Sequence, residues 1–240
     1  MSVLNALYSK LPPGRPATSA ELAALGVSAD LAVHYVRAGW LVRLARGVFT
    51  RPEAPLALHP SLLVLERRVT GLHVGGTSGL DWHGVRHHVA QHPRLHLYGW
   101  VSTSLPSWFT DRFPSSYHRL RLFDEQPNAP LSVSRFERRA DGPLVSDPER
   151  AFLEVLSDVG VRQSLQDARD LLEGASSLRS AVVQELLGRC RQVKTVRLCL
   201  TLGRELGLPW AAKLDPRRLP TGSDRRWVGR SREGLLVLKA

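Results

Sequence analysis

Apolar positions at the start of the chain recur with the spacing of three short helices. In the first run, 2–11, apolar side chains recur three and four residues apart, and a Pro-Pro pair follows. Thr18 and Glu21 form a capping-box pattern, which predicts a second helix of about two turns ending at Gly26. A third helix is predicted over 29–38 by its amphipathic spacing.

The residues after the third helix alternate apolar and basic side chains around a glycine. Segments 40–44 and 48–51 are therefore predicted to form a β-hairpin that turns near Gly47. Three helices followed by a basic hairpin are typical of a winged helix-turn-helix, in which the helix after the turn enters the major groove of DNA. The sequence predicts such a DNA-binding domain over residues 1–52.

Helix and strand patterns are mixed in the rest of the chain. A Pro-rich connector near residue 55 separates the first domain from a second, predicted over 60–240. The fold class expected is α+β, with an N-terminal winged helix-turn-helix followed by a mixed α/β C-terminal domain that ends in a β-hairpin. The predicted elements of the second domain are a helix at 62–69, strands within 94–136 that include 95–98 and 120–123, helices within 147–206, and hairpin strands at 226–228 and 235–238.

The charge balance favours an anionic partner. Lys and Arg number 33 against 22 Asp and Glu, which gives a formal net charge of +11. A high net charge by itself favours nucleic acid only moderately, so the distribution of the basic residues matters more. The sequence shows neither an apolar run long enough to cross a membrane nor the pattern of a signal peptide, and a cytoplasmic location is expected.

Basic and polar residues gather on the third helix and on the hairpin. His34 and Arg37 lie three residues apart and share a helix face, while Ser28 is expected at the helix N-terminus. Arginines of the hairpin are suited to phosphate contacts. The alternative is a solvated basic face on a winged helix that binds protein. The candidates for DNA contact are Ser28, His34, Arg37, Arg43, Arg46 and Arg51.

A histidine-rich segment could suggest a metal site, but its context argues against one. Gly84 and Pro93 interrupt any continuous helix, and the segment has no His-Glu-x-x-His arrangement and no nearby cysteine. A polar loop and strand is the favoured interpretation, with no metal and no cofactor expected. The histidines concerned are His83, His87, His88, His92 and His96.

The sequence contains no convincing set of catalytic residues. Asp81 near His83 and the pair Asp124-Glu125 are interpreted as isolated surface acids, and no acid lies two positions before a lysine as in restriction-type nucleases. The glycine-rich segment 75–79 lacks the lysine and spacing of a phosphate-binding loop, so a tight turn or close helix packing is expected. The two cysteines, Cys190 and Cys199, are expected to be reduced core residues.

Several short motifs along the chain resemble those of the AbiEi antitoxins, which belong to abortive-infection toxin/antitoxin pairs of type IV. The motifs are the end of the third helix at 38–41, the hairpin turn 46–49, the segment 74–80 with His83-Gly84, the helix start 148–151, and the C-terminal segments 214–216 and 221–223. The chain departs from the family pattern at its last residues, 238–240, where an aromatic residue and a proline are often found.

The resemblance implies a two-part protein that is not an enzyme. Its winged helix would bind inverted repeats in its own promoter as a negative autoregulator, and its C-terminal domain would neutralise a nucleotidyltransferase-like toxin, with direct contact left open. Arg37, Arg43, Arg46 and Arg51 match the positions where the family contacts DNA. The alternatives are a winged-helix transcriptional regulator without a toxin and a nucleic-acid enzyme fused behind a winged helix.

A second basic region lies near the C-terminal end. Residues 213–239 carry eight basic side chains against three acidic ones, a local net charge of +5. This tail could extend along DNA, meet an acidic partner such as a toxin, or be a solvated cationic segment.

Overall fold

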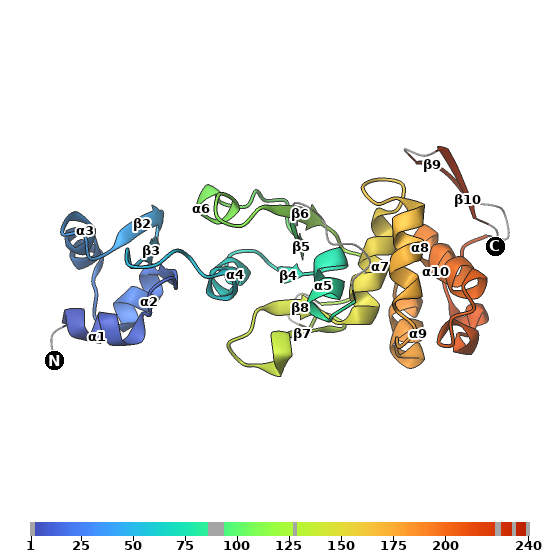
Figure 1. Ribbon diagram of the computed structural model, residues 1–240, viewed down its shortest axis with the longest axis horizontal. Coiled ribbons are helices and arrows are strands. Elements are labelled where there is room, and N and C mark those ends of the chain that lie inside the picture. The colour runs from blue at the N-terminus through green and yellow to red at the C-terminus, as the bar shows by residue number, and fades with distance from the viewer. Residues whose placement is uncertain (1–2, 86–93, 127–128, 224–226, 232–233, 239–240) are drawn as a thin grey trace.

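The computed structural model is an elongated molecule in which an N-terminal unit, a central sheet and a group of C-terminal helices follow one another (Figure 1). It contains three hydrophobic clusters. It describes residues 3–85, 94–126, 129–223, 227–231 and 234–238. The first cluster belongs to the N-terminal unit, the second to a central sheet, and the third to a group of C-terminal helices. The N-terminal unit and the helical group lie at opposite ends of the molecule.

The N-terminal unit contains the three predicted helices and the predicted hairpin. Its three strands form an antiparallel sheet in the order β1-β3-β2. The sequence did not predict β1, because this strand of two residues is defined only by its pairing with β3. The elements are α1 (Val3–Lys10), β1 (Ala17–Thr18), α2 (Ser19–Ala24), α3 (Ala29–Arg37), β2 (Val42–Ala45) and β3 (Val48–Thr50).

The capping box predicted from the sequence is confirmed. The Thr18 hydroxyl accepts a hydrogen bond from the amide of Glu21 at 3.2 Å, and the Glu21 carboxylate accepts one from the amide of Thr18 at 2.8 Å. This capping box satisfies two amides that the first turn of α2 would leave unpaired. Leu7, Leu22 and Tyr35 are buried together beneath the three helices.

The central unit is built on a mixed five-stranded sheet. Its strands lie in the order β6-β5-β4-β8-β7, with β5 parallel to β6, β4 parallel to β8, and the other pairs antiparallel. The prediction of a strand at 120–123 was wrong, since β6 ends before it and the chain continues as a loop. The elements are α4 (Leu58–Glu66), β4 (His73–Val74), α5 (Gly76–Trp82), β5 (Leu95–Gly99), α6 (Ser107–Thr110), β6 (Ser115–Arg119), β7 (Val133–Arg135), a 3₁₀ turn (Phe136–Arg138) and β8 (Leu144–Ser146).

The glycine-rich segment packs a helix closely, which is one of the two roles expected from the sequence. It forms the start of α5, and a Cβ built on Gly79 would lie 3.1 Å from the Cβ of Ala151 in α7 (Pro148–Asp158). The small residue therefore lets the two helices approach each other.

Four helices make up most of the C-terminal part, followed by the predicted hairpin. Cys190 and Cys199 are buried and free, and burial raises the pKa of both thiols, which makes them poor nucleophiles. The expectation of two core cysteines is confirmed. The elements are α7, α8 (Leu165–Glu173), α9 (Ser180–Gly188), α10 (Val193–Glu205), 3₁₀ turns at Ala211–Lys213 and Pro216–Arg218, and the antiparallel pair β9 (Trp227–Ser231) and β10 (Gly234–Leu238).

The N-terminal unit is attached to the central unit by side chains as well as by the connector. Val48 of the hairpin is fully buried and belongs to the hydrophobic cluster of the central unit. Arg67, just after α4, forms an ion pair with Glu21 of α2 at 2.8 Å. The amide of Ala57 donates to the carbonyl of Gly14 at 2.8 Å. One side of the hairpin is therefore covered by the central unit, whereas Arg43 and Arg46 are exposed.

Candidate nucleic-acid interface

Helix α3 begins at the residue that the sequence predicts as its cap. The hydroxyl oxygen of Ser28 accepts a hydrogen bond from the amide of Leu31 at 3.2 Å. The hydroxyl hydrogen of Ser28 stays available to a partner, because the cap uses only an oxygen lone pair.

One face of α3 is exposed along its whole length. Asp30, Val33, His34 and Arg37 are all exposed and recur with helical spacing, while Ala32 and Tyr35 on the opposite side are buried. Val33 is 45% exposed although its side chain is apolar. The exposed face thus combines charged, polar and apolar side chains.

A groove runs between α2, α3 and the hairpin. Its volume is about 760 Å³. Small and apolar side chains make its floor, and the three arginines of its lining come from α3 and from the hairpin. The lining brings together four of the six predicted DNA-contact residues, which are Ser28, Arg37, Arg43 and Arg46.

The cations of the groove have no carboxylate partner among the described residues. Arg37, Arg43 and Arg46 are exposed, and within the described part of the chain none of them forms an ion pair. Three unpaired guanidinium groups around one groove create a positive potential that attracts an anion such as a phosphate backbone.

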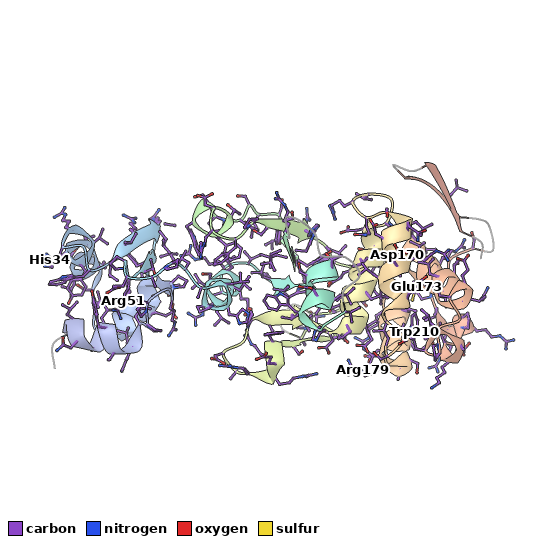
Figure 2. The ribbon with its side chains drawn as sticks, in the orientation of Figure 1. His34, Arg51, Asp170, Glu173, Arg179 and Trp210 are labelled. Atoms are coloured by element: carbon purple, nitrogen blue, oxygen red, sulfur yellow. The ribbon has the colours of Figure 1, made fainter. Side chains whose placement is uncertain are left out.

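His34 lies on the same helix but outside the groove lining. Its ring is exposed and lies 6.2 Å from the ring of Trp40 in an edge arrangement. Figure 2 shows His34 at the outer end of the N-terminal unit. It can meet a ligand that extends past α3.

Arg51 lies apart from the other candidates. Its guanidinium group donates to the carbonyls of Tyr8 and Leu11 at 3.1 and 3.2 Å and pairs with Glu53 at 2.8 Å. The side chain is only 11% exposed, and Figure 2 shows it set back from His34. These contacts use the guanidinium group to connect α1 to the chain after β3, so Arg51 does not line the groove.

The hairpin turn that carries Arg46 is supported from two sides. Gly47 has a φ of +71°, a conformation that favours glycine, and its carbonyl accepts from the amide of Ser19 at 3.1 Å. Arg68 approaches the carbonyls of Arg46 and Gly47, each at 3.4 Å. Sequence reasoning missed Arg68, because its link to the hairpin spans about twenty residues.

The histidine-rich segment lies partly outside the described residues. His87, His88 and His92 belong to the part of the chain that is not described. His83 contacts the carbonyl of Ser146 at 3.0 Å, and His96 contacts the ring of His118 at 2.9 Å. Among the described residues, no group of three or more potential ligands could hold a metal ion.

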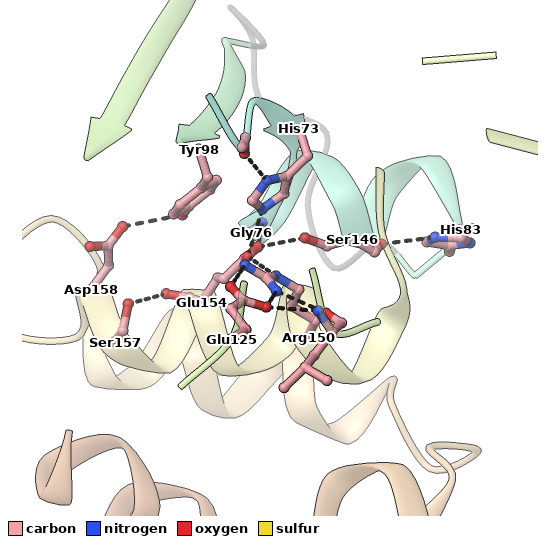
Figure 3. A network of polar contacts seen from close by, with 12 residues as sticks. His73, Gly76, His83, Tyr98, Glu125, Ser146, Arg150, Glu154, Ser157 and Asp158 are labelled. Atoms are coloured by element: carbon pink, nitrogen blue, oxygen red, sulfur yellow. Dashed lines mark hydrogen bonds and ion pairs between the residues drawn. The ribbon is translucent and has the colours of Figure 1, made fainter. Parts of the chain in front are cut away.

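A buried polar cluster lies between α7 and the strands β4 and β8 (Figure 3). The carboxylate of Glu154 in α7 contacts Nε2 of His73 at 2.9 Å and accepts from the amide of Gly76, the hydroxyl of Ser146 and the guanidinium of Arg150 at 3.0, 2.9 and 2.8 Å. Burial opposes its charge, but His73 and Arg150 outweigh this effect and hold the pKa of Glu154 at about 2.

The same cluster corrects one prediction from the sequence. Glu125 is not a surface acid: it is buried and accepts two hydrogen bonds from the guanidinium of Arg150, at 2.7 and 2.9 Å. Its neighbour Asp124 is exposed, as expected, and pairs with Arg191 at 2.7 Å. The buried carboxylates are fully engaged with partners, so the cluster connects α7 to the sheet.

The fold resembles a solved structure. The chain is similar to the crystal structure of the RV2827C protein from Mycobacterium tuberculosis, with 16% sequence identity over 95% of this chain and 87% of that one, and a TM-score of 0.56. At this identity the likeness concerns the fold. No curated protein sequence matches the chain.

Two family models match the chain, one after the other. Residues 1–91 match the model described as transcriptional regulator, AbiEi antitoxin N-terminal domain, and residues 92–239 match that described as transcriptional regulator, AbiEi antitoxin, type IV toxin-antitoxin system. Both descriptions are of a regulator and antitoxin, and none of the described helices is long and apolar enough to cross a membrane. The resemblance seen in the sequence is confirmed, and the chain belongs to the AbiEi antitoxin family of type IV toxin-antitoxin systems.

Proposed function

We propose that the chain is an autoregulating antitoxin whose residues 1–52 are a winged helix-turn-helix domain that binds operator DNA in its own promoter. The order α1-β1-α2-α3-β2-β3 with a three-stranded sheet supports this assignment. In such a domain the third helix enters the major groove and the hairpin contacts the adjacent backbone or minor groove. Inverted repeats are the expected form of the operator.

The observation that carries the proposal is the position of the arginines. Arg37 of α3 and Arg43 and Arg46 of the hairpin line one groove, although they come from different elements. All three are free of carboxylate partners in the described structure. A duplex whose major groove receives α3 would bring its phosphates to the hairpin arginines. Ser28, at the N-terminus of α3, would donate its hydroxyl hydrogen to a phosphate or a base edge.

We assign the second role to residues 60–240. Their central sheet and C-terminal helices form the antitoxin domain, which would neutralise a nucleotidyltransferase-like toxin. The family membership supports a toxin partner, and the antitoxin and regulator descriptions favour a protein that is not an enzyme. The antitoxin domain would act in the same cell compartment as the DNA, which we propose to be the cytoplasm.

Binding to the promoter tests the first role. The purified full chain is titrated against a duplex from upstream of its own gene and against a scrambled duplex, at several salt concentrations. We expect the promoter duplex to be preferred and the preference to persist near physiological salt. If both duplexes bind equally well and binding is lost as the salt concentration rises, the basic residues bind DNA without sequence specificity.

Growth of cells tests the second role. The gene of the proposed toxin partner is expressed from an unrelated inducible promoter, with and without the antitoxin. We expect the antitoxin to restore growth. Continued growth arrest in the presence of folded antitoxin would contradict this role.

A further inference from the structure

The exposed face of α3 contains one large apolar side chain that stays accessible to a partner. Val33 is 45% exposed, and it lines the groove together with Arg37, which lies one helical turn further along. A β-branched residue at an exposed helix position has a lower helix propensity than most alternatives, and nearly half of Val33 stays accessible to a partner. Its contribution is therefore to be sought in a complex.

The surroundings of Val33 indicate what covers it. The groove that Val33 lines carries Arg37, Arg43 and Arg46, which have no carboxylate partners in the described structure. An apolar partner protein would leave these charges buried without partners, at a considerable cost. A DNA duplex satisfies both features, because phosphates surround a major groove in which the methyl group of thymine is the apolar element.

We propose that Val33 determines specificity by contacting the 5-methyl group of a thymine in the operator. This inference rests on the proposed DNA binding and adds to it the identity of a base. Arg37 follows Val33 by four residues, a rise of about 6 Å along the helix, or about two base-pair steps. Arginine on the same face makes its most specific contact with guanine. Each half-site therefore holds a thymine with a guanine within about two base pairs.

Removal of single methyl groups from the DNA tests the contact directly. The probe is the promoter duplex shortened to the segment that the full chain protects. Each thymine in turn is replaced by deoxyuridine, which keeps the base pairing and removes only the methyl group. Loss of the contact at the critical thymine is expected to weaken binding about fourfold, the effect of exposing one methyl-sized group.

Variants of the protein show whether Val33 makes that contact. Val33→Ala is expected to bind the unmodified duplex about fourfold more weakly and to bind the thymine and deoxyuridine duplexes equally well. The substitution is compatible with folding, because alanine is the best helix former and the site is exposed. Val161→Ala is the matched control, since Val161 is 55% exposed and lies outside the N-terminal unit; it should keep the full methyl effect.

The outcomes separate this inference from the proposed function. A methyl effect that is present with the natural protein and absent with Val33→Ala supports the contact. The inference would be overturned if the chain prefers the promoter duplex but no thymine shows a methyl effect that depends on Val33. In that case operator binding would still stand. Failure of the full chain to prefer the promoter duplex over the scrambled one would overturn both.

Discussion

The guanidinium group of Arg51 lies over the ring of Tyr8, with 3.8 Å between its central carbon and the ring centroid. The same group donates to two carbonyls at the end of α1 and pairs with Glu53. Arg51 is predicted from the sequence as a DNA contact. In the structure it instead stabilises the N-terminal unit, because it connects α1 to the residues that follow β3.

Replacement of Arg51 should therefore affect folding more than DNA electrostatics. We expect Arg51→Ala to lower the free energy of unfolding by about 2 kcal/mol, through the lost cation–π contact and hydrogen bonds. Urea denaturation of the full chain measures this change. The salt dependence of DNA binding, measured where the variant is folded, should keep its natural slope. An unchanged stability with a reduced slope would instead place Arg51 on a phosphate.

Replacement of Arg46 should have the opposite result. Arg46 is exposed at the hairpin turn and free of carboxylate partners among the described residues. We expect Arg46→Ala to reduce the slope of log K against log salt by about 0.9, the value for one phosphate contact, and to change stability by less than about 0.5 kcal/mol. Arg189→Ala, an exposed arginine after α9, is the control and should leave the slope unchanged. If both variants show the same salt-dependence slope, Arg46 does not contact a phosphate.

Local interactions were predictable from the sequence. The capping box of Thr18 and Glu21 and the cap at Ser28 each join residues three apart, so the contact follows from the pattern itself. The close packing at Gly79 is one of the two roles expected for the glycine-rich segment, because small residues permit either a tight turn or a close approach.

Contacts between distant segments were not predictable. Glu125 is adjacent in sequence to an exposed acid, and only the fold shows that it is buried against Arg150, 25 residues away. In the candidate site, the pattern identified the arginines of the groove but could not show that Arg51 is directed inward or that Val33 is directed outward. Those directions depend on how α1 and the hairpin pack against the rest of the unit. Such packing joins segments that are distant in the sequence, so no local spacing of residues predicts it.

The buried Arg150 should be important for stability. Its guanidinium pairs with both Glu125 and Glu154, and its side chain is 2% exposed. We expect Arg150→Met to lower the free energy of unfolding by about 3 to 5 kcal/mol, because two buried carboxylates lose their partner. Arg191→Ala, which breaks the exposed pair with Asp124, should cost less than about 1 kcal/mol. Chemical denaturation measures the free energy of unfolding of both variants. If both lose only a small and similar amount of stability, the buried carboxylates must be neutralised by other groups.

Stability should decrease as the pH falls below neutral, partly through His118. Burial lowers the pKa of His118 to about 4, while Asp158, 3.8 Å from Nδ1, opposes this shift only in part. A histidine whose pKa is lower in the folded state binds fewer protons there than when unfolded, so it destabilises the fold as pH falls from about 6.5 to 4. We expect His118→Asn to have a flatter stability profile in this range, measured by urea unfolding. A profile parallel to that of the natural protein would contradict the shift.

Regulation and neutralisation should be separable by substitutions in the groove. Arg37 and Arg43 lie in the N-terminal unit, at the opposite end of the molecule from the C-terminal helices (Figure 1). We expect the double variant Arg37→Ala, Arg43→Ala to lose repression of a reporter driven by its own promoter, yet to restore growth when the toxin is expressed from an unrelated promoter. Point variants suit this test better than removal of 1–52, because Val48 is buried in the core of the central unit and its loss would expose that core. Loss of both activities in a variant that folds normally would mean that neutralisation requires the DNA-binding groove.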